Sequence, residues 1–183
     1  EGAAPATFSM IPLLSATVQD VDIINNELTG DGTSAGYGIG AYGGYGSMDI
    51  DLTVTNNKIN NFGVGLDIFQ CTGSCTTGVF SNVTVNLNSI TGNADYGLLN
   101  TDAIPVNAEL NWWNSPDGPA PTGSGDLVGG DADYTPWLCD GTDTSTATGF
   151  QPTGQTDCAP PIVSGTIAQP SVIYLNGWVL IKA

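Results

Sequence analysis

Histidine and arginine are missing from this sequence, and only two of its 183 residues are cationic, Lys58 and Lys182. Eighteen acidic residues give a formal net charge of −16. Clustered lysine and arginine bind a nucleic-acid backbone, so this balance excludes nucleic acid as a partner, and an anionic membrane surface as well. Without imidazole there is no histidine-based triad and no ordinary zinc or haem ligand. Without arginine there is no bidentate clamp for phosphate or carboxylate substrates. We therefore expect a protein that is not an enzyme.

No run of apolar residues approaches the roughly 18 that a membrane-spanning helix needs, so no membrane span is predicted. Hydrophobic residues nonetheless make up 40% of the chain, and four tryptophans distinguish it from an acidic disordered coil. The 25 glycines and 11 prolines, with abundant Asn and Asp, favour frequent turns and few helices. The length suits one domain with a structured tail. We expect an all-β protein.

The four cysteines form two close pairs, each inside a loop rich in small polar residues: Cys71 with Cys75, and Cys139 with Cys158. Three pairings are formally open. Proximity favours disulfides within the two pairs, with free thiols and a metal site as alternatives. An Asn-X-Thr sequon makes Asn82 a candidate glycosylation site. Together these features predict an extracellular or cell-surface location. The chain starts at Glu1 without a signal-peptide pattern, so we expect a processed form or a fragment.

Four segments of the chain align without gaps and share one asparagine in register. The shared residues are Asn26, Asn57, Asn88 and Asn111, which lie 31, 31 and 23 residues apart. An apolar residue follows each asparagine two positions later, and a short alternating run typical of a half-buried strand precedes it. In parallel stacked coils these asparagines lie about 4.8 Å apart, where their amides can bond to the neighbouring coil. The pattern predicts a β-solenoid with an asparagine ladder.

A second motif, aromatic then glycine then aliphatic, recurs downstream of the first three asparagines. Its three copies are Tyr37-Gly38-Ile39, Phe62-Gly63-Val64 and Tyr96-Gly97-Leu98. The glycine lies 12, 6 and 9 residues after the asparagine, so the spacing varies. This variation predicts fixed strands joined by turns of different lengths.

The run Asn-Trp-Trp-Asn-Ser-Pro-Asp-Gly-Pro at 111–119 is followed by Gly-Asp-Leu-Val at 125–128 and Asp-Tyr-Thr-Pro-Trp-Leu at 133–138. This succession resembles the closing segment of right-handed parallel β-helix (pectin-lyase-like) domains in microbial secreted and surface proteins. Asn114 stands where those families usually have glycine. The resemblance spans about residues 17–138 and implies a short right-handed parallel β-helix of three to four coils. Because the family contains lyases, glycosidases, epimerases and non-catalytic surface repeats, it implies architecture more than activity.

The resemblance also implies that a catalytic site or a calcium site should be considered. The β-helix lyases hold calcium with aspartates and use arginine or lysine as the base, which neither lysine here is placed to supply. Glycosidases need paired carboxylates. The candidates are Asp20 with Asp22, Asp49 with Asp51, and Asp67 or Asp95 near the second strand. We interpret these aspartates as a solvated acidic face, because an acid–base pair needs buried, tuned carboxylates.

Two loops are candidate binding sites. Asp126, Asp131 and Asp133 crowd a glycine-rich loop that is a candidate calcium site, with a solvated loop as the alternative. No other cofactor is expected. Tyr37, Tyr42 and Tyr45 are separated by glycines and form a candidate surface for glycans or a neighbouring subunit.

We divide the chain into an N-terminal cap or subunit-contact segment at 1–16, a parallel β-helix at 17–138, and a disulfide-bridged loop with a C-terminal hairpin at 139–183. Asn176-Gly177 between two apolar runs predicts this hairpin. Its Tyr174 and Trp178 are candidate contact residues. A lone hairpin is unstable in water, so we expect it to cover an end of the solenoid or to dock on the next subunit.

The leading functional hypothesis is a non-catalytic structural subunit that assembles with copies of itself into an extracellular filament or a cell-surface layer. The first alternative is an adhesin or carbohydrate-binding β-helix domain. The second is a truncated domain similar to polysaccharide lyases or glycosidases.

Overall fold

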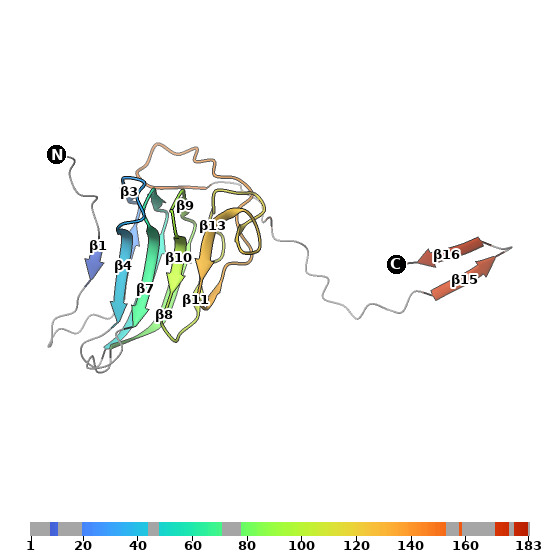
Figure 1. The fold of residues 1–183 in the computed structure, drawn as a ribbon, viewed down its shortest axis with the longest axis horizontal. Helices are drawn as coiled ribbons and strands as arrows, with labels where there is room; N and C mark the ends of the chain where they lie inside the picture. Colours follow the sequence, from blue (N-terminus) through green and yellow to red (C-terminus); the bar gives the residue numbers. More distant parts are fainter. Residues whose placement is uncertain are drawn as a thin grey trace.

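The structure is a computed structural model that describes residues 8–10, 20–43, 48–70, 78–152, 158, 171–175 and 178–182. Every regular secondary-structure element in these ranges is a β-strand. The parallel strands wind into a β-solenoid of about three turns (Figure 1). The predicted all-β parallel solenoid is therefore confirmed.

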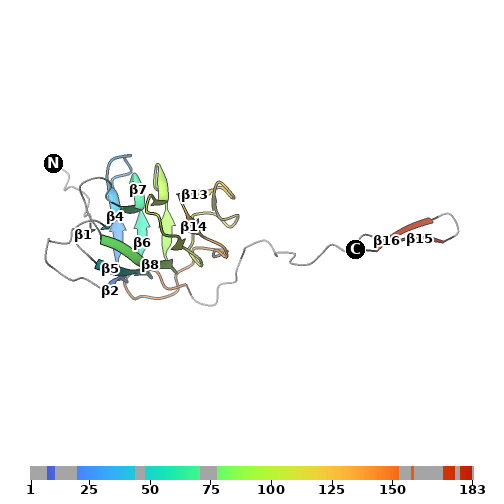
Figure 2. The same cartoon turned by 90° about the horizontal axis from the view of Figure 1, so that it is seen from below.

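Three parallel sheets form the walls of the solenoid, and successive coils add strands to each. The first sheet contains, in spatial order, β1 (Phe8–Met10), β4 (Tyr37–Gly43), β7 (Val64–Gln70), β10 (Tyr96–Asn100), β13 (Gly125–Gly129) and β12 (Pro119–Ala120). The second contains β14 (Ala132–Asp133), β11 (Val106–Asn107), β8 (Gly78–Asn86), β5 (Met48–Thr55) and β2 (Asp20–Ile24). The third contains β3 (Glu27–Thr29), β6 (Lys58–Asn60) and β9 (Ser89–Thr91). Figure 2 shows β4 and β7 on one side of the solenoid and β2, β5 and β8 on the other.

Apolar side chains fill the interior because alternate residues of each strand point inward. The parallel register places like residues over one another: Ile39 pairs with Leu66, Val54 with Val85, and Ile59 with Ile90. All of these side chains are buried. Each coil therefore buries its apolar side chains against those of its neighbours, as expected for a solenoid.

The four aligned asparagines stack at the turn between the second and third sheets. The backbone N–H and Nδ2 of Asn57 both donate to Oδ1 of Asn88, at 2.9 and 3.0 Å. Asn26 donates to Asn57 in the same way, and Asn88 to Asn111. Asn57, Asn88 and Asn111 are fully buried. Each amide also donates to carbonyl groups of the surrounding turns, so the column satisfies backbone groups that burial would otherwise leave unpaired.

The residue before each ladder asparagine has a left-handed backbone conformation. Asn25 and Asn56 occupy this position in the first two coils, with φ of 59° and 57°. Leu87 and Leu110 occupy it in the next two, with φ of 57° and 56°. Asparagine tolerates this conformation better than leucine. The turn geometry is thus conserved from coil to coil even where the residue type is not suited to it.

The predicted alignment of the aromatic-glycine-aliphatic motif is confirmed for two copies and wrong for the third. Tyr37 and Tyr96 both pair with Val64, so the glycines in register are Gly38, Gly65 and Gly97. The sequence prediction had aligned Phe62-Gly63-Val64, two residues too early. The reason is a corner at Asn61, whose left-handed φ of 59° turns Phe62 into the core ahead of the strand. A Cβ atom at Gly65 would lie 2.6 Å from the carbonyl oxygen of Gly97, so only glycine fits this position.

Residues 112–138 close one end of the solenoid. Trp113 and Trp137 are buried, and Nε1 of Trp137 donates to the carbonyl of Pro116 at 3.0 Å. The Trp137 ring packs so closely on Gly118 that a Cβ atom there would lie 2.5 Å from it. Asn114 has a left-handed φ of 69°. Asparagine accepts this conformation more readily than most residues other than glycine.

Residues 139–152 return across the coils as a strap, which is the name used below for this segment (Figure 1). Phe150 is buried, its N–H donates to the carbonyl of Asn56, and its own carbonyl accepts from Nδ2 of Asn56. The predicted Cys139–Cys158 disulfide is present. Residues 139–152, the first part of the predicted disulfide-bridged loop, thus pack on the solenoid.

The two ends of the chain also contain strands. β1 adds a parallel strand beside β4, with Ser9 paired to Gly40. β15 (Ser171–Leu175) and β16 (Trp178–Lys182) form an antiparallel pair in which Leu175 lies opposite Trp178. This pair is the predicted hairpin, and its strands pair only with each other among the described strands.

Candidate functional site

A surface pocket of about 290 Å³ lies on the outer face of the first sheet, across β4, β7 and β10. Parallel register places Gly40, Asp67 and Leu99 in one row across these strands. The neighbours of Asp67 along β7, Leu66 and Ile68, point into the core, so the carboxylate points outward. The pocket is lined by Tyr37, Tyr42, Asp67, Phe69, Leu99 and Thr101.

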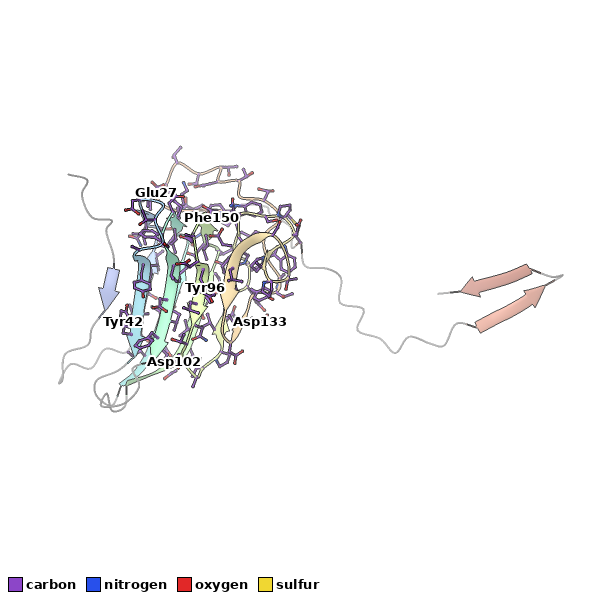
Figure 3. All side chains as sticks on the ribbon, viewed as in Figure 1. Glu27, Tyr42, Tyr96, Asp102, Asp133 and Phe150 are labelled. Carbon is purple, nitrogen blue, oxygen red and sulfur yellow. A yellow bond between two sulfur atoms is a disulfide. The ribbon has the colours of Figure 1, made fainter. Side chains whose placement is uncertain are left out.

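Aromatic rings form one wall of this pocket. Tyr42 and Phe69 pair across β4 and β7, with ring centroids 5.6 Å apart and planes at 77°, an edge-to-face contact. The Tyr42 ring also lies over Gly40, where a Cβ atom would be 3.1 Å from it. Tyr37 and Phe69 remain 41% and 36% exposed. The rings are therefore held by the sheet and still accessible to a ligand; Tyr42 is labelled in Figure 3.

Asp67 is the one carboxylate among the pocket-lining residues, and it is only 7% exposed. No described residue donates a hydrogen bond to it or forms an ion pair with it. Burial raises the pKa of Asp67 above its ordinary value. Burial also raises the pKa of Tyr42, and the negative charges of Asp67 and Tyr37 raise it further. The pocket thus places a carboxyl group that has no partner among the described residues beside aromatic rings.

The sequence predicted part of this site. Tyr37 and Tyr42 line the pocket, whereas Tyr45 lies outside the described residues. Asp67 had been considered only as a catalytic carboxylate, and Phe69 and Leu99 were missed. The signal available was a single acid inside the apolar run Leu66-Asp67-Ile68-Phe69. Tyr174 and Trp178 lie on β15 and β16, where only the backbone is described.

The remaining candidate carboxylates lie elsewhere. Asp20 pairs with Asp51 across β2 and β5, on the exposed face of the second sheet. Asp51 accepts a hydrogen bond from Nδ2 of Asn82 at 2.8 Å, and Asn82 is itself exposed. Asp22 and Asp95 are also exposed, and the side chain of Asp49 lies outside the described residues. Asp20, Asp22, Asp51 and Asp95 do not line the pocket around Asp67.

The structure does not group the candidate calcium ligands Asp126, Asp131 and Asp133 into one cluster. In the part of the chain that the structure describes, no three acidic or cysteine side chains are grouped so as to hold a metal ion. Asp126 instead accepts hydrogen bonds from the backbone N–H groups of Gly92 and Asn93 and from Nδ2 of Asn93, at 2.8 to 2.9 Å. Its carboxylate completes a turn in the neighbouring coil, while Asp133 bonds the N–H of Thr135. Asp126 thus stabilises a turn of the neighbouring coil, and Asp133 stabilises its own turn.

Cys71 and Cys75 lie outside the described residues, so their predicted disulfide stays a prediction. Over the described ranges, no helix is both long and apolar enough to cross a membrane.

The end of the solenoid opposite the tryptophans is a second notable surface. β2 and β3 are edge strands there. A depression of about 310 Å³ is lined by Asp22, Ile23, Ile24, Asn26 and Leu28, and Ile24 is 42% exposed. Asn26 is the terminal rung of the ladder, and its Oδ1 receives no hydrogen bond from any described residue. We call this surface the open end.

No family model, curated protein or solved structure matches the chain. The functional conclusions below therefore depend on the chain's own residues.

Proposed function

We propose that this protein is a non-catalytic, cell-surface or extracellular β-solenoid domain that binds carbohydrate through the pocket around Asp67. The observation that carries the proposal is the grouping of Tyr37, Tyr42 and Phe69 with one carboxylate on the outer face of a rigid sheet. Aromatic faces stack on the apolar faces of sugar rings, and a carboxylate accepts hydrogen bonds from hydroxyl groups. Few convergent polar groups in a mostly apolar hollow are typical of small-ligand sites.

The composition of the pocket supports binding over hydrolysis. A glycosidase places two carboxyl groups on either side of the scissile bond, roughly 5 to 9.5 Å apart. Asp67 is the single carboxyl among the described residues of the pocket, and the exposed aspartates named above lie on the second sheet or in turns. A lone acid can orient a hydroxyl group but cannot act as both acid and base.

The Cys139–Cys158 disulfide supports the proposed location, because such bonds persist mainly in oxidising compartments. Asn82 supports it further, since its sequon lies on an exposed position of β8 where a glycan would not disturb the core.

A glycan array followed by titration calorimetry tests the carbohydrate proposal. We expect binding of short oligosaccharides that Tyr42→Leu weakens and Tyr42→Phe retains, because the ring and not the hydroxyl contacts the sugar. Tyr134→Leu is the matched control, since that tyrosine lies away from the pocket and hydrogen-bonds Thr122. Absence of any glycan binding, or equal loss in the control, would overturn the proposal.

The open end favours a second function, assembly with copies of itself. Unpaired strand edges readily pair with other chains. The exposed Ile24 and the depression beside it add apolar surface to these edges. The other end is closed by Trp113 and Trp137, so a filament needs a second contact surface, for which we propose the β15–β16 hairpin.

Light scattering and negative-stain microscopy test this assembly. We expect concentration-dependent oligomers that Ile24→Lys disperses, and shorter or no filaments when residues 171–183 are removed. Ile104→Lys, at a partly buried position away from the open end, controls for a general loss of apolar surface. Monomers at all concentrations would rule the assembly out.

A further inference from the structure

We infer that the pocket around Asp67 binds a protonated amine, so that the glycan it accepts is an amino sugar with a free ammonium group. This inference rests on the proposed carbohydrate function and names the ligand class of the same site. It concerns the charge of the ligand, which the proposed function leaves open.

The first observation behind this inference is the burial of Asp67 without a described partner. The residue is only 7% exposed, and it lines the pocket without a hydrogen-bond or ionic partner among the described residues. Buried carboxylates are normally paired with a cation or with several donors, because an isolated buried charge is strongly unfavourable. Among the residues that the structure describes, no group supplies that partner to Asp67. A bound ammonium group would supply it.

The second observation is the group of aromatic rings around the carboxyl group. Tyr37, Tyr42 and Phe69 lie around the same pocket as Asp67. A cation within about 6 Å of a ring centroid is attracted to the face of the ring, and such aromatic groups are widely used to bind ammonium ligands. A neutral sugar can donate hydroxyl hydrogen bonds to the carboxylate, whereas an aminated sugar also places a positive charge beside both the carboxylate and the rings.

Lys58, whose side chain is described, is paired with other acids and not with Asp67. Lys58 lies on β6 and forms ion pairs with Glu27 and Asp143, at 3.1 and 3.0 Å. Lys182 lies at the end of β16. With a formal net charge of −16, the protein also repels uronic acids and sulfated glycans and attracts cationic ones. The size of the pocket, about 290 Å³, suits one ring or one ammonium-bearing group.

Oligomers of glucosamine and of N-acetylglucosamine provide the test, because they differ only in the charge and acylation of the amine. Calorimetry at mildly acidic pH is expected to show tighter binding of the glucosamine oligomer by about tenfold or more. Equal affinity, or preference for the acetylated oligomer, would overturn the ammonium inference and leave the carbohydrate function intact. Binding of neither, with silence toward all other glycans, would overturn the carbohydrate function itself.

Two variants distinguish a specific site at Asp67 from general electrostatic attraction of a cationic glycan to an acidic protein. Asp67→Asn is expected to reduce glucosamine-oligomer affinity about tenfold and to leave the acetylated oligomer nearly unchanged. Asp20→Asn removes the same charge from an exposed position on the second sheet and is expected to have no more than a small effect. Equal effects of the two variants, or abolition of the preference by moderate salt alone, would overturn the inference. Tetramethylammonium, used as a competitor, is expected to displace the glucosamine oligomer.

Discussion

Nζ of Lys58 lies 3.0 Å from Oδ2 of Asp143 and so ties the third sheet to the strap. The same strap buries Phe150 and bonds its backbone to Asn56. One of the chain's two cations therefore holds a returning segment that crosses several coils. Ion pairing raises the pKa of Lys58, chiefly through its bonds to Asp143 and then Glu27. The pair therefore remains charged throughout the neutral range.

We expect Asp143→Asn to loosen the strap without unfolding the solenoid. The asparagine keeps the Oδ1 atom that accepts from the N–H of Ser145 and loses the charge that Lys58 contacts. The free energy of unfolding should fall by about 1 kcal/mol or less, and hydrogen exchange at the Phe150 amide should accelerate. Glu27→Gln, which affects the more exposed partner, should have a smaller effect. Unchanged exchange at Phe150 would show that the ion pair does not hold the strap.

The asparagine ladder predicts a graded response to alanine. Asn88→Ala removes a buried amide that accepts from Asn57 and donates to the carbonyls of Val54 and Asn86, so several buried groups lose partners. We expect a loss of about 3 kcal/mol or more in urea unfolding. Asn26→Ala, at the open end, should cost about 1 kcal/mol because water can replace its bonds. Equal costs at both positions would contradict the role of burial.

Leu87 is a site where the protein can be stabilised. It holds a left-handed conformation, which Asn25 and Asn56 hold in the preceding coils. Leu87→Asn should increase the free energy of unfolding by about 1 kcal/mol, because it relieves unfavourable backbone geometry. Leu87→Ala keeps the strain and removes the side chain, so it should be neutral or destabilising. If both variants behave alike in thermal unfolding, the backbone conformation is not the cause.

Asp67 predicts a specific pH dependence of stability. Because burial raises its pKa in the folded state, the folded protein holds the proton more tightly than the unfolded chain. Its contribution to stability is thus greatest below the unfolded pKa and falls as the pH rises through the folded pKa. Asp67→Asn should therefore stabilise the ligand-free protein at neutral pH and have little effect at low pH, measured by urea unfolding.

Asp31 is the matched control for this dependence, because its pKa is shifted in the opposite direction. Its side-chain hydrogen bond with Thr33, and then that residue's backbone N–H, lower the pKa. Asp31→Asn should destabilise the protein at neutral pH and lose this effect as the pH falls through the folded pKa. The same sign for both variants would contradict the assignment for Asp67.

The sequence was informative where structure repeats at fixed intervals. The spacing of Asn26, Asn57, Asn88 and Asn111 predicted stacked turns because a solenoid coil repeats the same local geometry. The motif at Phe62 was misplaced by two residues because a left-handed corner at Asn61 shifts the chain before β7. Pattern alone cannot detect such a shift, since glycine and an apolar residue occur at both registers.

The candidate site was harder to predict because it combines residues from different coils. Asp67 and Leu99 become neighbours only through the β7–β10 register. The strap was missed for a similar reason, as Asn56 and Phe150 are 94 residues apart in the sequence. Asp126 resembled a calcium ligand because its loop is rich in acids and glycines, yet its oxygens already bond Gly92 and Asn93.

The 31-residue interval between ladder positions makes the coil a transferable module. A tandem duplication of residues 57–87 would present the same upper and lower surfaces to its neighbours as the original coil. The engineered solenoid should grow by about one strand spacing, roughly 4.8 Å, and the strap, which bonds Asn56, would have to span one more coil. The length of such a solenoid can therefore be set by the number of coil repeats encoded in one reading frame.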